Sequence, residues 1–401
     1  MKIGILTFHS EVNYGSVLQA FAMQTHLEGL GHDVVIIDKY EDAANSRLLG
    51  PFCWKSSKAW VCYIIRALLF SGGFARLRRH LKTIRMIRKY LKRTPYHFFK
   101  WEDAPRNLGV DMISVGSDQV WNPIIVDPSD YLLKNVPGAV PGIAYAASIG
   151  RRDLRADLLP EYEAGFRRFV AIGVREEEAQ RLVESTGAEA AHVVDPTLLV
   201  DPEKCWRRFV TKPRCHRKTL FVYTMADDII EQVPRLVEFA KRMDAQVELY
   251  LDWQLLPIPT KTVGRVIRWL KLWRNLIGGR IRIRISASPD EFVNSIAHAT
   301  WCVTESFHGL MFSTIFRKNV RAVVKATGDV RGSMSSRLTE IAKAFIHGPL
   351  IKATLPEALE SLERMESVSY DEEAIARRIS ESREWLVSAI EKGRVKCAQS
   401  A

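Results

Sequence analysis

The feature that most constrains the fold is an alternation of strand-like and helix-like segments. KIGILTF (2–8) is an apolar run of strand length, and SVLQAFAMQTHLEGLG (16–31) carries apolar residues near helical spacing and ends in glycine. DVVIIDK (33–39) is a second apolar run, whose unbroken Val-Val-Ile-Ile indicates burial on both faces. Strand, helix and strand within about 40 residues form the unit of a parallel α/β sheet.

The alternation continues along the chain and restarts after a change in composition near 201–218. A chain of 401 residues also exceeds what one core usually covers. We therefore expect two α/β domains, residues 1–200 and 201–350, followed by C-terminal helices over 351–401. The further strand-like runs begin at 111, 142, 171 and 191 in the first part, and at 218, 245, 300 and 319 in the second.

Composition limits the class of protein. Hydrophobic residues make up 47% and charged residues 26%, as in soluble globular proteins, and the N-terminus does not resemble a signal peptide. The apolar run at 59–70 is short and carries Arg66, so we expect no membrane span. The six cysteines lack CxxC spacing and histidines at zinc-site distances. These features predict a cytoplasmic protein with free thiols and no metal site.

The net charge of +12 is concentrated in two segments. Residues 43–101 contain no Asp or Glu, and we expect a basic helical insertion over about 45–100. A second basic stretch covers 261–285. One interpretation is a solvated basic face; the other is peripheral contact with the anionic inner face of a membrane, because Trp, Phe and Leu interleave with the charges. No nucleic-acid-binding motif accompanies the charges, so we expect no nucleic-acid partner.

Polar motifs follow several of the expected strands, where parallel sheets bind ligands. In NYGS, Asn13, Tyr14 and Gly15 lie at a strand-to-helix turn, where the amides of the helix N-terminus favour an anion, although Ser16 could serve only as a helix cap. Neither GxGxxG nor a P-loop is present.

GSDQVWN (116–122) is richer in polar groups than a turn requires. Asp118 and Gln119 could hydrogen-bond a sugar hydroxyl, and Trp121 could offer an apolar platform. Further along, Arg175 ends a strand before three glutamates. Its guanidinium suits a carboxylate or phosphate ligand, or it pairs with a neighbouring glutamate.

TESFHGLMFS (304–313) contains the strongest catalytic candidate. His308 lies between a strand-like and a helix-like segment, flanked by Ser306 and Gly309. A histidine there is either a core residue or a proton donor, and its position favours the second. In SSRLTEI (335–341), Arg337 occupies a first helical turn, where a cation is unfavourable unless it faces an anion.

Together these segments resemble the polysaccharide pyruvyl transferase family. The resemblance rests on an ordered series covering residues 13 to about 345: NYGSVLQAF, GSDQVWN, IAYAASIG, the VREEE strand end, VVDPTLL and TESFHGLMFS. It implies two Rossmann-like domains facing across a cleft, the GT-B arrangement. It also implies transfer of a pyruvyl ketal from phosphoenolpyruvate to hydroxyls of a polysaccharide or lipid-linked saccharide precursor, with release of phosphate.

The resemblance also implies roles for individual residues. Several members carry Arg-Leu-His where this chain has Ser306, Phe307 and His308. The histidine matches, but a donor-binding cation must come from elsewhere in this chain. We therefore predict His308 as general acid. The predicted donor-binding residues are Arg175, Arg337, Ser306, Phe307, Gly309 and Ser336, and the predicted acceptor-binding residues are Asn13, Tyr14, Gly15, Asp118, Gln119 and Trp121.

The predicted reaction needs an acid–base group and a cationic cradle, so we expect no cofactor besides the donor substrate. Two alternatives remain from the sequence. One is a GT-B glycosyltransferase that uses a nucleotide sugar, and the other is a non-catalytic saccharide-binding protein.

Overall fold

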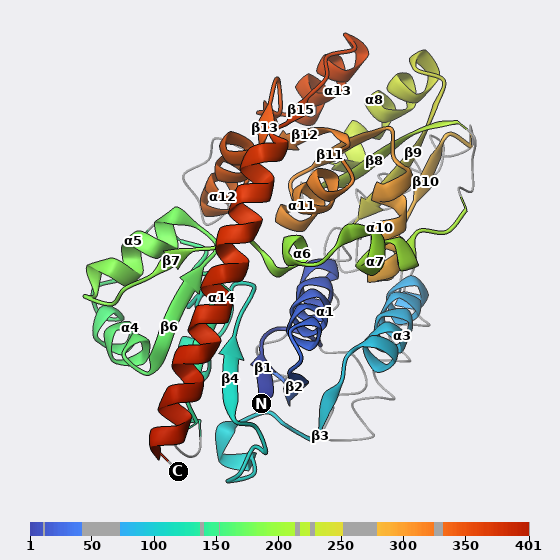
Figure 1. Ribbon diagram of the computed structural model, residues 1–401. Helices are drawn as coiled ribbons and strands as arrows, with labels where there is room; N and C mark the ends of the chain where they lie inside the picture. The colour runs from blue at the N-terminus through green and yellow to red at the C-terminus, as the bar shows by residue number, and fades with distance from the viewer. Residues whose placement is uncertain are drawn as a thin grey trace. The chain divides into compact units, whose positions relative to one another are not determined.

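The computed structural model describes residues 1–10, 13–41, 73–136, 140–151, 153–212, 217–224, 229–251, 279–324 and 332–400 (Figure 1). The chain forms two compact units. The first unit comprises Met1–Cys53, Ile84–Cys205 and Glu373–Ala401, and the second comprises Trp54–Thr83 and Trp206–Glu372.

The first unit contains a parallel sheet of seven strands in the order β3-β2-β1-β4-β5-β6-β7. Its central strands are entirely buried, which agrees with their uninterrupted runs of apolar and small residues. The strands are β1 (Lys2–Leu6), β2 (Asp33–Lys39), β3 (Arg93–Phe98), β4 (Met112–Val115), β5 (Gly142–Ala147), β6 (Phe169–Val174) and β7 (Ala191–His192).

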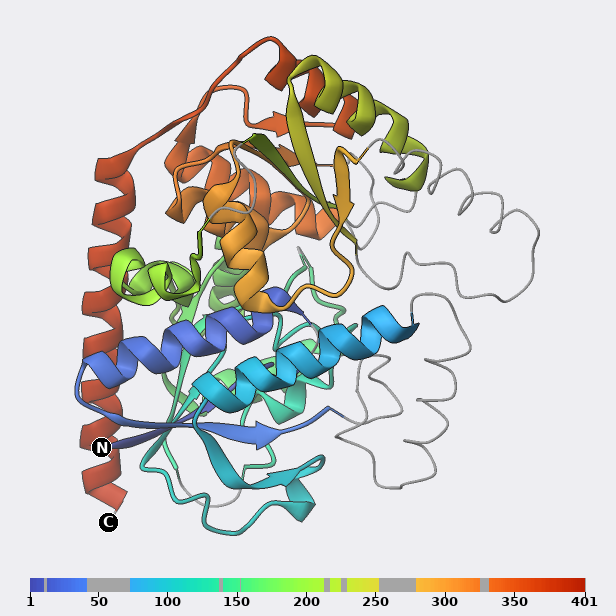
Figure 2. The ribbon, with the colours of Figure 1, turned by 90° about the vertical axis from the view of Figure 1, so that its right-hand side faces the viewer.

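Helix α1 (Tyr14–Gly29) follows β1 and begins earlier than the sequence predicted. Asn13 caps it, because its side-chain oxygen accepts a hydrogen bond from the Gly15 amide at 2.9 Å. Helix α1 lies beside α3 (Gly73–Tyr90), where the Phe21 and Tyr90 rings are 5.6 Å apart (Figure 2). The boundary between the units divides α3, with residues up to Thr83 in the second unit and those from Ile84 in the first. The other described helices of the first unit are α4 (Leu159–Phe166), α5 (Glu177–Ser185), α6 (Pro196–Leu199), α7 (Pro202–Cys205) and α14 (Glu372–Ser400).

The second unit contains a parallel sheet of six strands in the order β10-β9-β8-β11-β12-β14. A short antiparallel pair, β13 (Ile346–His347) and β15 (Ser369–Tyr370), lies outside it. The six strands are β8 (Lys218–Thr224), β9 (Ala245–Leu251), β10 (Ile281–Ile283), β11 (Trp301–Thr304), β12 (Asn319–Val323) and β14 (Ile351–Lys352). The helices are α8 (Ile229–Arg242), α10 (Pro289–His298), α11 (Phe307–Ile315), α12 (Gly332–Phe345) and α13 (Leu355–Glu363).

Both sheets place their strands in the same relative order. Numbered within each unit, the first six described strands of either sheet are arranged third, second, first, fourth, fifth, sixth. The chain therefore reverses direction across the sheet between β1 and β4 in the first unit and between β8 and β11 in the second. In open α/β sheets, ligands bind at the carboxyl ends of the strands beside such a reversal.

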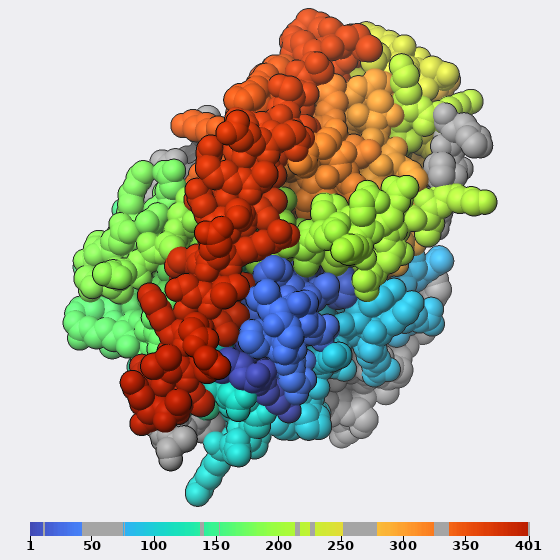
Figure 3. Space-filling model, viewed as in Figure 1, coloured from blue at the N-terminus to red at the C-terminus, as the bar shows by residue number. Residues whose placement is uncertain are grey.

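The expected fold class is confirmed: the chain forms two parallel α/β units with helices at its C-terminal end. The division falls between Cys205 and Trp206, and the region expected as separate C-terminal helices is split, with α13 in the second unit and α14 in the first. Figure 3 shows α14 along its length on the surface.

The basic insertion is partly helical, as expected, through α3. Residues 93–98, however, form the edge strand β3, and 42–72 lie outside the described residues. Most of the second basic stretch, 261–278, also lies outside them. Within the described ranges, no helix is both long and apolar enough to cross a membrane.

Candidate functional site

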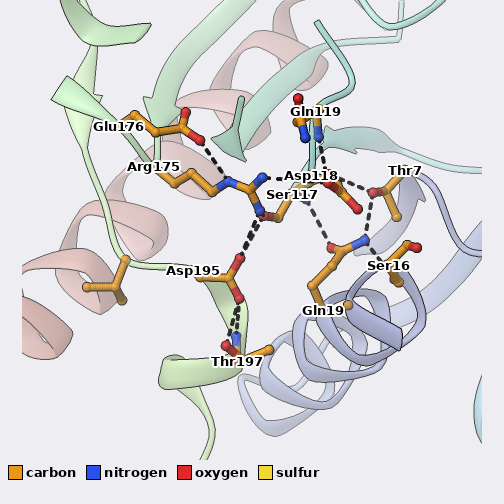
Figure 4. Close-up of polar contacts among 12 residues, drawn as sticks. Thr7, Ser16, Gln19, Ser117, Asp118, Gln119, Arg175, Glu176, Asp195 and Thr197 are labelled. Carbon is orange, nitrogen blue, oxygen red and sulfur yellow. Dashed lines mark hydrogen bonds and ion pairs between the residues drawn. The ribbon is translucent and has the colours of Figure 1, made fainter. Parts of the chain in front are cut away.

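A buried polar network occupies the carboxyl edge of the first sheet, beside the reversal between β1 and β4. Figure 4 shows Arg175 and Asp195 on one side, Gln19 and Thr7 on the other, with Ser117 and Asp118 between them. These residues follow β1, β4, β6 and β7, apart from Gln19 on α1. Four strand ends and one helix therefore converge on one cluster.

Arg175 is held on every side by protein groups. Its Nε donates to Glu176 at 3.0 Å, and its Nη1 contacts Asp195 at 3.3 Å and the Ser117 hydroxyl at 3.3 Å. Its Nη2 is 3.5 Å from an Asp118 oxygen, and the side chain is only 1% exposed. Burial favours the neutral guanidinium, but the charges of Glu176, Asp118 and Asp195 outweigh it and raise the pKa of Arg175.

These contacts favour the alternative that the sequence left open for Arg175, pairing with a neighbouring glutamate. A guanidinium already engaged by three carboxylates does not offer the free donor-binding cation that the sequence predicted. The structure contains this pairing together with two carboxylates from β4 and β7. Arg175 therefore organises the network and sets the position of Asp118.

The side of the network around Asp195 was missed by the sequence reasoning. Asp195 is fully buried and accepts hydrogen bonds from both the amide and the hydroxyl of Thr197, at 3.0 and 2.7 Å. It also accepts from the Ser117 hydroxyl at 3.0 Å. The Asp-Pro-Thr sequence after a strand was a usable signal, because Asp195 caps α6.

Gln19 and Thr7 join the other side of the network to β4. The Gln19 amide nitrogen donates to the Thr7 hydroxyl at 2.9 Å, and its oxygen accepts from the Ser117 amide at 3.2 Å. The Thr7 hydroxyl donates to the Ser117 carbonyl at 2.8 Å. The sequence analysis did not single out Gln19, whose neighbours on α1, Leu18 and Ala20, are apolar.

The backbone around Asp118 has an uncommon conformation. Gly116 has φ +97°, and a Cβ there would lie 2.6 Å from the Tyr145 carbonyl oxygen, so the position requires glycine. Asp118 itself has φ +75°, a conformation rare for residues with side chains and often found at functional sites. At 11% exposed, its side chain is the most accessible of the three carboxylates around Arg175.

The remaining predicted acceptor residues differ in their burial and contacts. Asn13 is exposed and caps α1, and Gln119 is partly buried, with its side-chain oxygen accepting from Asn122 at 2.7 Å. Gly15 is buried within the first turn of α1. Tyr14 and Trp121 belong to the core, and the Trp121 indole packs against Phe166 while donating to a backbone carbonyl. The prediction that Trp121 offers a platform to a sugar is therefore wrong for this conformation.

A second cluster, also missed, adjoins the ends of β1 and β2. The two ring nitrogens of His9 face an Asp38 oxygen at 2.8 Å and the Thr7 carbonyl at 3.1 Å. Arg93 donates to the other Asp38 oxygen at 2.9 Å. Burial would raise the pKa of Asp38, but His9 and Arg93 more than offset it and lower the pKa.

The second unit carries its own candidate site after β11, beside the reversal between β8 and β11. Ser306 caps α11 by accepting from the Gly309 amide at 3.3 Å, and its own amide donates to the Thr304 hydroxyl at 3.0 Å. A Cβ on Gly309 would lie 2.3 Å from the Thr304 hydroxyl oxygen. Glycine therefore lets α11 begin directly against the strand.

His308 lies in the first turn of α11, 7% exposed, and its ring is 5.2 Å from that of Phe307. The guanidinium of Arg337, on α12, lies over the Phe307 ring, 5.9 Å from its centroid. The structure thus brings together three residues that the sequence assigned to the donor site. The side chain of Ser336 lies outside the described residues.

Several solved structures have a similar fold. UDP-N-acetylglucosamine 2-epimerase from Rickettsia bellii is 9% identical, with TM-score 0.50 and 100% of this chain and 96% of that chain covered. MnaA of S. aureus with UDP is 12% identical, with TM-score 0.51 and 97% and 95% covered. A putative UDP-N-acetylglucosamine 2-epimerase from Listeria monocytogenes is 10% identical, with TM-score 0.50 and 97% and 95% covered. These likenesses identify the fold as GT-B type.

No curated protein matches the chain significantly by sequence. A family model does match, over residues 13–324, and its description is polysaccharide pyruvyl transferase. This span includes the cap of α1, the Ser117–Asp118 turn, Arg175, Asp195 and the start of α11. Most residues of the two carboxyl edges, though not Thr7 and Arg337, therefore lie within the matched region, and the chain belongs to the polysaccharide pyruvyl transferase family.

Proposed function

We propose that the protein transfers a pyruvyl group from phosphoenolpyruvate to two hydroxyls of a polysaccharide or lipid-linked saccharide precursor, forming a ketal and releasing phosphate. The observation that carries this proposal is the grouping of His308, Phe307 and Arg337 at the carboxyl edge of the second sheet, in a chain of this family. It joins a proton donor, a cation and a helix N-terminus, the groups that this donor substrate requires.

Phosphoenolpyruvate presents a phosphate and a carboxylate. The N-terminus of α11 favours an anion through its dipole and amides, and Arg337 supplies a guanidinium beside Phe307. Since Arg175 is engaged by carboxylates, Arg337 is the stronger candidate for the cation that replaces the missing arginine of the Arg-Leu-His pattern.

The chemistry balances without a redox step. One acceptor hydroxyl adds to the central carbon of phosphoenolpyruvate, while a proton from His308 converts the methylene to a methyl group. Phosphate then leaves with the carbon–oxygen bond electrons, and the second hydroxyl adds to the same carbon. Of the two hydroxyl protons, one replaces the proton given by His308 and the other leaves with phosphate.

On the acceptor side, we propose that Asp118 and Gln119 bind hydroxyls of the saccharide. Asp118 is the most accessible carboxylate of its network, and Arg175 restrains it at 3.5 Å. The backbone amide of Gln119 donates to Oδ1 of the same carboxylate at 2.8 Å, which restrains the orientation of the Asp118 side chain.

The test is mass spectrometry of a panel of glycosides incubated with the protein and phosphoenolpyruvate, together with a phosphate-release assay. We expect one acceptor to gain the mass of a pyruvyl ketal with stoichiometric phosphate. Transfer of a sugar from a nucleotide sugar, without ketal formation, would support the glycosyltransferase alternative. Saccharide binding without either reaction would support the non-catalytic alternative.

A further inference from the structure

Helix α3 has one buried face and one exposed basic face. Its buried residues anchor the helix: Arg79, His80, Thr83, Met86 and Ile87. Its exposed residues are Arg78, Leu81, Arg85, Arg88 and Lys89, which we call the α3 stripe. Because one face of α3 is buried, the helix is held in place, and the basic side chains of its opposite face are exposed to solvent.

The spacing of the α3 stripe makes it continuous. Arg78, Leu81, Arg85 and Arg88 are separated by three, four and three residues, which places them on one side of an α-helix. Lys89 broadens the same side by one position. At about 1.5 Å per residue, the stripe extends over roughly 17 Å.

The charges of the stripe are only weakly offset by acidic neighbours. Within the described part of the chain, no ion pair involves Arg78, Arg85 or Lys89, and the sequence from 43 to 101 contains no Asp or Glu. Two ion pairs beside the stripe, Lys82 with Glu291 at 2.7 Å and Lys92 with Glu28 at 2.8 Å, involve residues outside it. The stripe is therefore a surface of a single charge sign.

From these observations we infer that the α3 stripe docks the protein reversibly on a bilayer surface that contains anionic lipid. Basic residues near such a surface strengthen partitioning by roughly fivefold each. Leu81, 47% exposed in the middle of the stripe, can enter the interface between headgroups and acyl chains. An apolar side chain among the charges favours a lipid interface over a polynucleotide, whose backbone offers no apolar layer.

The experiment uses the full-length protein in co-sedimentation with vesicles of neutral lipid, or of neutral lipid with about one-third phosphatidylglycerol, at low and physiological salt. The test variant is Arg78→Glu/Arg85→Glu/Lys89→Glu. The matched control is Arg168→Glu/Arg235→Glu/Lys241→Glu, which changes net charge equally at exposed positions elsewhere. A Leu81→Ser variant separates the apolar contribution from the charge.

We expect wild type and control to bind anionic vesicles at least about tenfold better than neutral ones, with weaker binding at higher salt. The stripe variant should lose at least about tenfold, and Leu81→Ser severalfold. Equal partitioning into both vesicles, no binding at all, or an equal loss in stripe variant and control would overturn the inference. Tighter binding to a single-stranded oligonucleotide than to vesicles at the same salt would also overturn it. No donor or acceptor is present, so the outcome is independent of the proposed reaction.

Discussion

Arg175 and Arg337 are both buried arginines in the matched family region or just beyond it, but their partners differ. Arg175 faces three carboxylates, so Arg175→Ala would leave buried negative charge and should cost about 3–5 kcal/mol of the free energy of unfolding. Arg337→Ala should instead weaken phosphoenolpyruvate binding by roughly 1.5–3 kcal/mol. Urea unfolding and titration calorimetry separate the two effects; unchanged donor affinity in Arg337→Ala would remove Arg337 from the proposed donor site.

His308 is a single side chain whose two interpretations predict different results. As the proposed general acid, His308→Ala should keep the wild-type fold and lose at least ~10²-fold in turnover. His347→Ala, an exposed histidine in the same unit, provides the control and should react normally. Turnover is measured as phosphate release with whichever acceptor the glycoside panel identifies. Wild-type turnover in His308→Ala would mean that His308 is a core residue without a catalytic role.

Asp118 and Asp195 face the same guanidinium but differ in exposure, 11% against 0% for the side chains. Asp118→Asn should weaken acceptor binding by roughly 1.5–3 kcal/mol with little change in stability, because the amide keeps the shape but loses the charge that strengthens hydrogen bonds from saccharide hydroxyls. Asp157→Asn, an exposed site paired with Arg155, is the control. Titration calorimetry with the acceptor measures the loss, and unchanged acceptor affinity in Asp118→Asn would remove Asp118 from the proposed acceptor site.

At the scale of elements, the start of α11 depends on the absence of a side chain at Gly309. An added Cβ would lie 2.3 Å from the Thr304 hydroxyl oxygen, so Gly309→Ala should displace the first turn and with it His308. We expect turnover to fall at least tenfold, which corresponds to an increase of ~1.4 kcal/mol in the activation free energy. Thr304→Ala in the same protein should restore part of it by opening space. Gly29→Ala, with nothing within 4 Å, is the matched control and should be neutral or slightly stabilising.

The elements themselves were largely predictable, while their contacts were not. Buried strands such as β2 and β5 show as apolar runs, and the polar motifs expected after strands do follow β1, β4, β6 and β11. Strand β3 was missed because an edge strand with Arg93 and His97 lacks that signal. The contacts of Arg175 could not be predicted because its partners Ser117 and Asp195 are 58 and 20 residues away, and only the folded sheet brings them together.

At the scale of the whole molecule, the two sheets repeat one strand order although the sequence shows no internal repeat. The order follows from chain connectivity and the handedness of crossover connections, which many sequences satisfy. The architecture therefore provides one candidate site beside the reversal of strand order in each sheet. The side chains at each site determine what it can do. Carboxylates dominate the edge of the first sheet, and a histidine with an arginine marks the second.

The C-terminal helix links the far end of the chain to the network around Asp195. The Ser382 hydroxyl accepts from the Val194 amide at 3.0 Å, and Arg378 donates to the His192 carbonyl at 3.0 Å. Trp385 fits against Gly173 of β6, where an added Cβ would lie 2.8 Å from the indole. The segment that carries Asp195 is therefore held from the side by α14.

Trp385→Ala should consequently loosen this segment as well as reduce packing. We expect a loss of roughly 2 kcal/mol in the free energy of unfolding, together with faster amide hydrogen exchange in residues 192–199. Val387→Ala, on the same helix but 51% exposed, should change stability by less than about 0.5 kcal/mol and leave the exchange pattern unchanged. Exchange measured by mass spectrometry at the peptide level distinguishes the two variants. If Trp385→Ala lost stability while residues 192–199 kept their protection, α14 would cover the sheet without supporting the Asp195 segment.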